Sequence, residues 1–180
     1  MDTTYILQAA QREWAANRTG PLTVTDNPSF AFQKIPEDDL RSLNAAELLE
    51  DRIDQAHIEY LFETDYYPPY PGPRLQQYPP LVRDGFISIT AALIAPVSRG
   101  SVTLQSPLPN DPPVIDPNYY SSKTDLALAL YGFKAARTIL ADPRLSTYTV
   151  GPANGEVVPG PEVQSDEEIL QYVTIFFIFY

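Results

Sequence analysis

The sequence predicts an α+β fold in which helices flank an antiparallel β-sheet. Apolar and polar residues alternate in two segments, 87–93 and 101–105, and this period of two is typical of strands. Segments 4–17 and 126–141 are instead rich in helix-forming residues, and each is followed by a proline-containing stop signal. Because the strand patterns are grouped apart from the helical ones, we expect an antiparallel sheet packed by helices.

The composition narrows the classes of function. With 180 residues, 44% of them hydrophobic, the chain is long enough for one domain with a core. Its 12 basic and 23 acidic side chains give a formal charge of −11, which disfavours nucleic-acid binding. No cysteine occurs, so disulfides and thiolate metal sites are excluded. The N-terminal segment lacks the pattern of a secretory signal, and no apolar run reaches membrane-spanning length.

Two helices are predicted in the first third of the chain. The first runs from about Thr4 to Asn17, and its apolar face is made by Ile6, Ala10 and Trp14. The second opens at a capping-box pattern, Asn44 with Glu47, and continues along an apolar stripe made by Leu49, Ile53, Ala56 and Tyr60. Between them, short extended pieces and a turn at 26–28 are expected.

The alternating segments 87–93 and 101–105 are predicted to pair as an antiparallel hairpin. The five residues between them, "PVSRG", end in a glycine, which suits such a connection. We therefore expect the apolar side chains of both strands to be largely buried, namely Ile87, Ile89, Leu93, Val102 and Leu104. A brief third strand in "PVIDPNY" should end in a turn at Asp116-Pro117-Asn118, where the polar side chains can bond nearby amides.

The last third of the chain contains two further capping signals. Ser122 and Asp125 precede the longest helix, which Asp142-Pro143 ends. Ser165 and Glu168 open another helix at "DEEILQYV". The chain then changes composition abruptly to "TIFFIFY", an uncharged segment with high β-propensity.

Residues that could carry chemistry have ordinary structural explanations. His57 is the single histidine and lies one residue off the stripe of the second predicted helix, so we interpret it as structural. Acidic residues form three clusters, at 37–39, 50–54 and 166–168. Two of these clusters lie in predicted first turns of helices, where negative charge is favourable. Neither G-x-G-x-x-G nor G-x-x-x-x-G-K-[ST] is present. The segment "DYYPPYPGPRLQQYPP" is interpreted as a surface loop, with a polyproline ligand as the alternative.

One long stretch is more specific than these features. "PVSRGSVTLQSPLPNDPPVIDPNYYSSKTDLALALYGFKAAR" resembles the C-terminal half of the glucose–methanol–choline (GMC) oxidoreductases. The pattern P-x-S-R-G-x-V-x-L is followed by a proline-rich spacer and P-x-I-D-P-N-Y, and then by a helix with Asp125, Gly132 and Arg137. With "NRTGPLT" at 17–23, which also resembles the family, the similarity covers about residues 5–172.

The resemblance implies a substrate-binding domain: an antiparallel sheet of about six strands with outer helices, lying over the flavin of a separate FAD domain. Residues 1–172 would form part of this domain, and 173–180 an atypical hydrophobic tail. The family's signature residues would have scaffold roles, with Gly100 free to adopt positive φ in a turn. These signature residues are Pro96, Ser98, Arg99, Gly100, Asp116, Pro117, Asn118 and Tyr119.

The resemblance also implies a chemistry that this chain is not expected to perform alone. GMC enzymes oxidise the CH–OH group of an alcohol: a histidine base takes the hydroxyl proton and hydride passes to the flavin. The dinucleotide-binding glycines and the catalytic histidine segment have no counterpart here, so no residue is assigned as catalytic, cofactor-binding or metal-binding. We expect a truncated oxidoreductase that does not bind FAD by itself.

Two other roles remain open from the sequence. The chain could be a non-catalytic binding protein that uses the tyrosine–proline loop or the wall of the substrate pocket. It could also associate with another copy through its tail, because "VTIFFIFY" contains no charge, proline or glycine. Seven or eight residues are too few to span a bilayer, so self-association is preferred over membrane insertion.

Overall fold

The computed structural model describes residues 3–23, 29–51, 54–63, 87–145, 147–149 and 155–177. Within them, three strands form an antiparallel sheet in the order β1-β2-β3: β1 (Ser29–Gln33), β2 (Ile58–Glu63) and β3 (Ser88–Leu93). In the register, Tyr60 at the middle of β2 lies opposite Ala31 of β1 and Ala91 of β3. The strand predicted at 87–93 is therefore confirmed.

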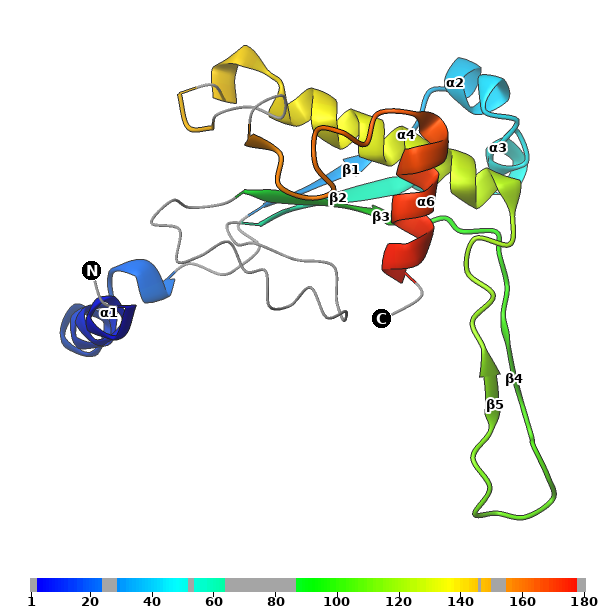
Figure 1. The fold of residues 1–180 in the computed structure, drawn as a ribbon, viewed down its shortest axis with the longest axis horizontal. Helices are drawn as coiled ribbons and strands as arrows, with labels where there is room; N and C mark the ends of the chain where they lie inside the picture. Colours follow the sequence, from blue (N-terminus) through cyan, green and yellow to red (C-terminus); the bar gives the residue numbers. More distant parts are fainter. Residues whose placement is uncertain are drawn as a thin grey trace.

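Helices lie against one face of this sheet, as the α+β prediction requires. The longest, α4 (Lys123–Leu140), runs across β2 and β3, and α6 (Asp166–Phe177) packs against α4 (Figure 1). Two short helices, α2 (Glu37–Ser42) and α3 (Leu48–Asp51), lie between β1 and β2 in the chain. The first helix, α1 (Thr3–Asn17), precedes the 3-10 turn η1 (Pro21–Thr23), and a second such turn, η3 (Pro143–Leu145), follows α4.

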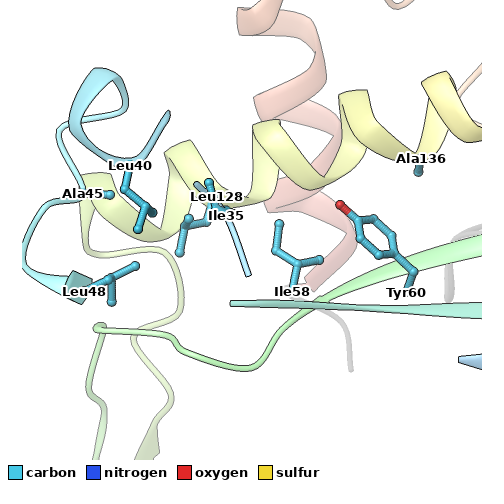
Figure 2. Packing of buried hydrophobic residues seen from close by; sticks show 8 residues of the cluster. All are labelled: Ile35, Leu40, Ala45, Leu48, Ile58, Tyr60, Leu128 and Ala136. Carbon is cyan, nitrogen blue, oxygen red and sulfur yellow. The ribbon is translucent and has the colours of Figure 1, made fainter. Parts of the chain in front are cut away.

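The main core lies between the sheet and α4. Ile58 and Tyr60 project from β2 toward Leu128 and Ala136 of α4, and α2, α3 and the segments beside them close the end of this layer (Figure 2). The helix can approach closely because Gly132 faces the sheet: a Cβ at this position would lie 3.1 Å from Ile58 Cδ1 and 3.2 Å from Ala91 Cβ. A second cluster, made by Ala129, Ile169 and Val173, joins α6 to the other side of α4.

The helix ends follow the capping signals of the sequence in two cases. Ser122 caps α4, because its side chain accepts a hydrogen bond from the Thr124 amide. At α6, Ser165 Oγ accepts from the Glu168 amide, and the Glu168 carboxylate accepts from the Ser165 amide at 2.9 Å. Both predicted helices are confirmed, and α6 continues past "DEEILQYV" to Phe177.

The second predicted helix, from Asn44 through Tyr60, is wrong. Asn44 does not open a helix; it follows α2 with φ of 55°, and its amide bonds back to the Arg41 carbonyl. Among the described residues of this segment, those of α3 are helical, and Tyr60 belongs to strand β2. The apolar residues at 49, 53, 56 and 60 have the spacing of a helix face. The end of the same segment also has the period of two of a strand, and Ile58, Tyr60 and Phe62 all lie on the α4 face of the sheet.

The predicted hairpin between 87–93 and 101–105 is also wrong. β3 pairs with β2, whereas β4 (Ser101–Thr103) pairs with β5 (Val114–Asp116) in a separate two-stranded ribbon that projects from the body (Figure 1). Val102 and Leu104 are 69% and 85% exposed, and Ile87 is 44% exposed, so their expected burial is wrong. Ile89 and Leu93 are half-buried against the main core.

Other sequence expectations have more limited outcomes. Segment 4–17 is helical as predicted, with Ala10 buried on α1 and Trp14 beside the Arg18 guanidinium. The resemblance implied about six strands, and the described residues contain the three-stranded sheet and the ribbon. The predicted turn at 26–28 and the tyrosine–proline segment at 65–80 lie outside the described residues.

Candidate functional site

The loop between β3 and the ribbon is held by a buried carboxylate from α4. Asp125, in the first turn of α4, is 1% exposed. Its Oδ1 accepts a hydrogen bond from the Val97 amide at 2.8 Å, and its Oδ2 accepts from the Ser98 amide at 2.9 Å. Two amides of the connection between β3 and β4 are therefore bonded to the helix. This contact turns the chain away from the sheet at Val97.

Further hydrogen bonds connect the same loop to the segment that follows β5, where the ribbon returns to the body. Ser98 Oγ accepts from the Ser122 amide at 3.0 Å, and Asn118 Nδ2 donates to the Arg99 carbonyl at 2.9 Å. Asn118 has φ of 49°, and its amide donates to Asp116 Oδ1 at 3.1 Å, so the predicted turn after β5 is confirmed. The two ends of the ribbon are thus tied to each other and to the start of α4.

Gly100 is required by close packing, and not by positive φ. The glycines with positive φ among the described residues are Gly20 and Gly160, so the expectation of positive φ at Gly100 is wrong. A Cβ at Gly100 would lie 2.2 Å from the Asp116 carbonyl oxygen and 2.5 Å from that of Pro117. These distances are shorter than any real contact, so a side chain here would push the two ends of the ribbon apart.

The signature residues meet in space, but they do not form a reactive group. The Arg99 guanidinium donates to the carbonyl oxygens of Pro96 and Ser98 at 2.9 and 2.8 Å, within its own loop. Tyr119 is 63% exposed. We name the hydrogen-bonded group of loop 97–99, Asn118, Ser122 and Asp125 the clamp. Beside it, burial and the charge of Asp125 raise the pKa of Tyr120, which keeps this phenol protonated. These residues form hydrogen bonds with backbone amides and carbonyls, and these bonds hold the two ends of the ribbon.

His57 also has a structural environment, at the start of β2 and not on a helix. It is 1% exposed, and its Nδ1 accepts a hydrogen bond from the Ile35 amide at 3.0 Å. Its backbone amide donates to Gln33 and its carbonyl accepts from Ile94, so one residue joins the segments after β1 and β3. Burial, with a smaller effect of Lys34, lowers the pKa of His57, which favours the neutral imidazole that accepts from Ile35.

Tyrosines fill the α4 side of the sheet with a hydrogen-bonded chain. Tyr60 Oη donates to Gln33 Oε1 at 2.6 Å, Gln33 Nε2 donates to Tyr131 Oη at 3.4 Å, and Tyr131 donates to Asp39 Oδ2 at 3.2 Å. Burial, and then the Tyr131 phenol, raise the pKa of Tyr60 to about 12. The network links β1, β2, α2 and α4, and it lies on the covered side of the sheet.

The opposite side, which we name the open face, is different. The register places Phe30, Phe32 and Leu61 on it, together with Glu59, Glu63, Ser88, Thr90 and Ala92. Phe30 and Phe32 are 56% and 64% exposed, whereas Thr90 Oγ1 donates to Glu63 Oε2 at 3.1 Å. The exposed apolar surface of β1 therefore lies on the same side of the sheet as a hydroxyl–carboxylate pair, of which Glu63 is buried. Sequence analysis did not single out these residues, although the alternation in "SFAFQ" marks two phenylalanines on one side of a strand.

Metal sites and membrane spans are absent from the part of the chain that the structure describes. There, no three His, Cys, Asp or Glu side chains are grouped so that they could hold a metal ion. In the same residues, no helix is both long and apolar enough to cross a membrane.

The comparisons with known proteins agree with the geometry of the clamp. The family model of GMC oxidoreductase matches residues 96–176, a range that contains all the signature residues. Versicolorin B synthase of Aspergillus parasiticus is 33% identical over 93% of this chain, and the glucose-methanol-choline family oxidoreductase mfmG of Annulohypoxylon moriforme is 30% identical over 93%. The chain belongs to the GMC oxidoreductase family.

This GMC oxidoreductase chain spans about a quarter of the length of its curated relatives. It covers 24% of versicolorin B synthase and 27% of mfmG. Patulin synthase of Penicillium expansum is 30% identical over 91% of this chain, which corresponds to 26% of that protein.

The N-termini of α4 and α6 in this GMC oxidoreductase chain do not fit the diphosphate of FAD. Diphosphates bind where a helix N-terminus offers free amides. At α4, Ser122 Oγ occupies the Thr124 amide, and the carboxylate of Asp125 lies in the first turn. At α6, the first turn carries Asp166, Glu167 and Glu168. Negative charge at both sites would repel a second anion.

Proposed function

We propose that this chain forms part of the substrate-binding domain of an FAD-dependent oxidoreductase that acts on the CH–OH group of an alcohol. Residues 1–172 supply the domain and 173–180 a hydrophobic tail. FAD would be held by protein outside the described residues, and the chain alone would neither retain FAD nor oxidise alcohols. Membership of the GMC oxidoreductase family supports the reaction class.

The observation that carries this proposal is the two-sided sheet. α4 and its tyrosine network cover one face, while the open face presents the exposed Phe30 and Phe32 of β1. The half-buried Leu61 and the Thr90–Glu63 pair, whose carboxylate is buried, lie on the same side. Small-molecule sites are usually apolar surfaces with a few placed polar groups. In this proposal the open face lies toward the flavin, and the phenylalanines contact the carbon skeleton of the alcohol.

The signature residues have a positioning role in this proposal. Asp125 and Asn118 hold the loop at 97–99 through backbone hydrogen bonds, and this loop directs β4 and β5 away from the sheet. The ribbon therefore leaves the body without covering the open face (Figure 1). None of these residues is assigned a catalytic role.

The first test uses the isolated chain. Purified protein is mixed with FAD and desalted, and its absorbance spectrum and its turnover of primary alcohols with a dye acceptor are measured. We expect no retained flavin absorbance and no turnover, because the N-termini of α4 and α6 are capped or acidic and do not suit the diphosphate. Any turnover by the isolated chain would contradict the proposal, and turnover that survives the His57→Ala substitution would show a catalytic site that does not use His57.

The second test asks whether the chain works as a substrate domain. The corresponding quarter of a relative such as mfmG is replaced by residues 1–172, and the chimera is purified. We expect it to retain FAD and to oxidise alcohols with an altered order of preference among them. The chimera could retain FAD and give a native-like circular dichroism spectrum but oxidise no alcohol, including the substrates of the parent enzyme. This result would contradict a substrate-binding role.

A non-catalytic binding protein is the second candidate, and the exposure of Phe30 and Phe32 is compatible with it. The two candidates differ in the chimera: a surface used only to bind a partner has no reason to support turnover next to FAD. The tyrosine–proline segment at 65–80 lies outside the described residues and adds no argument to either candidate.

A further inference from the structure

A row of three side chains crosses the open face. Thr90 of β3 lies opposite Leu61 of β2, and Leu61 lies opposite Phe30 of β1. The neighbours of Thr90 along β3, Ile89 and Ala91, pack into the core on the α4 side, which places Thr90 on the open face. Because adjacent strands lie about 4.8 Å apart, the row from Phe30 to Thr90 spans about 10 Å. A small alcohol that lies across the strands can therefore contact all three side chains.

The hydroxyl of Thr90 is oriented by a buried carboxylate. Thr90 is exposed, whereas Glu63 is 7% exposed, and Thr90 Oγ1 donates to Glu63 Oε2 at 3.1 Å. A threonine hydroxyl has one proton and two lone pairs. Since the proton is directed to Glu63, the oxygen of Thr90 can only accept a hydrogen bond from a molecule on the open face.

A second acceptor lies beside this row. The register places Glu59 on the same face, between Phe32 of β1 and Ala92 of β3. A carboxylate accepts hydrogen bonds and donates none. Thr90 and Glu59 therefore both fit a ligand that donates hydrogen bonds, and neither offers a proton to a ligand that only accepts them.

We propose that Thr90 is a specificity-determining residue that accepts a hydrogen bond from a second hydroxyl group of the alcohol. Phe30 and Leu61 contact the carbon skeleton, and Glu63 is a positioning residue that holds the Thr90 proton away from the substrate. The preferred substrates are therefore alcohols with a further O–H donor. This inference rests on the proposed function, in which the open face lies toward the flavin.

The first experiment uses the chimera of residues 1–172 with mfmG and two alcohols, 4-hydroxybenzyl alcohol and 4-methoxybenzyl alcohol. The methyl group removes the second O–H donor and leaves the reacting group unchanged, so we expect the chimera to prefer the hydroxylated alcohol. Thr90→Val removes the acceptor and should raise KM for this alcohol about 2- to 10-fold with kcat unchanged. KM for the methoxy alcohol should stay the same, and Thr90→Ser should restore the preference.

Two further variants separate recognition from a structural effect. Thr103→Val is the matched control, because Thr103 is an exposed threonine of strand β4 in the ribbon, and it should leave both KM values unchanged. Glu63→Gln supplies an amide that can donate to Thr90, so the hydroxyl proton can turn to the ligand. We expect this variant to weaken the preference for 4-hydroxybenzyl alcohol, which a loss of stability alone would not do.

The second experiment uses the full chain and needs no flavin. Nitrogen-15-labelled protein is titrated with the same two alcohols while its amide chemical shifts are followed. We expect shifts at 59–63 and 88–92, with a dissociation constant about 2- to 10-fold lower for 4-hydroxybenzyl alcohol than for the methoxy alcohol. Thr90→Val should remove this difference.

The outcomes distinguish this inference from the proposed function. A chimera without turnover, together with a full chain that still distinguishes the two alcohols, would contradict the proposed function and leave recognition by Thr90 in place. An active chimera in which Thr90→Val affects both alcohols alike, or no more than Thr103→Val, would overturn the inference alone. A full chain that binds neither alcohol, or binds them elsewhere than at 59–63 and 88–92, would overturn it as well.

Discussion

At the residue scale, two buried side chains hold backbone groups that would otherwise lack partners. Asp125 accepts the amides of Val97 and Ser98, and His57 accepts the amide of Ile35. Charge-assisted hydrogen bonds to backbone amides are stronger than neutral ones, and a buried amide without an acceptor is costly. Each of the two side chains therefore fixes the direction in which the chain leaves a strand.

Sequence analysis identified both residues but not what they bind. Asp125 lies three residues after Ser122, which is the spacing of a capping box, and a carboxylate at this position can turn either to its own helix or outward. Here it turns to a loop 27 residues earlier in the chain. Such a long-range partner leaves no local pattern. His57 was interpreted as structural, and its burial and hydrogen bond agree with that.

His57 should make the stability of the fold depend on pH. Its pKa is lowered from the ordinary value of 6.5, so the unfolded chain binds the proton more readily than the folded chain. The stabilising effect is complete above pH 6.5, and it is lost as the pH falls toward the lowered pKa of the folded state. One proton gives a slope of at most about 1.4 kcal/mol per pH unit.

Urea unfolding of the wild type and of His57→Gln would measure this effect. Glutamine can accept from the Ile35 amide but does not titrate, so its free energy of unfolding should vary less between about pH 7 and about pH 5.5. A variant with the same pH dependence as the wild type would show that another group causes the acid sensitivity.

At the element scale, strand patterns were predicted better than strand partners. The alternation at 87–93 and 101–105 indicated two strands correctly, but each pairs with a different neighbour from the one expected. Hairpin pairing was assumed because the connection is short. Asp125 of α4 and the Ser122 amide before it bind that connection, while β3 pairs with β2 and β4 with β5. The segment 44–60 fitted both a helical and a strand period, and burial of Ile58 and Tyr60 under α4 decided for the strand.

Gly100 should be essential for the ribbon. An alanine Cβ would meet the carbonyl oxygens of Asp116 and Pro117 at 2.2 and 2.5 Å, and backbone atoms cannot move aside as a side chain can. We expect Gly100→Ala to lower the free energy of unfolding by about 1–3 kcal/mol, as overpacking does. Amide hydrogen exchange at 101–103 and 114–116 should become faster.

Gly132→Ala is the control for this prediction. Its Cβ would meet side-chain atoms of Ile58 and Ala91 at 3.1 and 3.2 Å, and alanine favours a helix interior by about 1 kcal/mol over glycine. The net change should therefore be smaller, and exchange in the ribbon should stay slow. If Gly100→Ala left ribbon exchange unchanged, the close approach at Gly100 would not be what holds the two ends together.

At the scale of the whole molecule, the sheet separates two environments. α4, α6 and the short helices provide the buried side, while the open face and β1 provide exposed apolar side chains. The α+β class followed from local patterns, because helical and strand periods can be seen in single segments. The open face could not be predicted from local patterns. Its exposure depends on how β1 pairs with β2 and on which side of the sheet α4 packs.

The hydrophobic tail was predicted to promote self-association, and a version of the chain ending at Tyr172 was expected to be more soluble. The structure changes where the chain should be cut, because α6 continues to Phe177 and Val173 is 7% exposed in the cluster with Ala129 and Ile169. Ile175, by contrast, is 52% exposed. Val173 thus belongs to the packed part of the helix, and the exposed apolar surface begins after it.

Two shortened versions separate these contributions. The version ending at Thr174 keeps Val173, so it should unfold at the same urea concentration as the full chain while remaining soluble at higher protein concentration. The version ending at Tyr172 loses a buried side chain worth about 1.5–3 kcal/mol and should unfold at lower urea concentration. If both versions matched the full chain in solubility, the residues after Thr174 would already be covered and would not drive association. If they matched it in stability as well, Val173 would not contribute to holding α6 on α4.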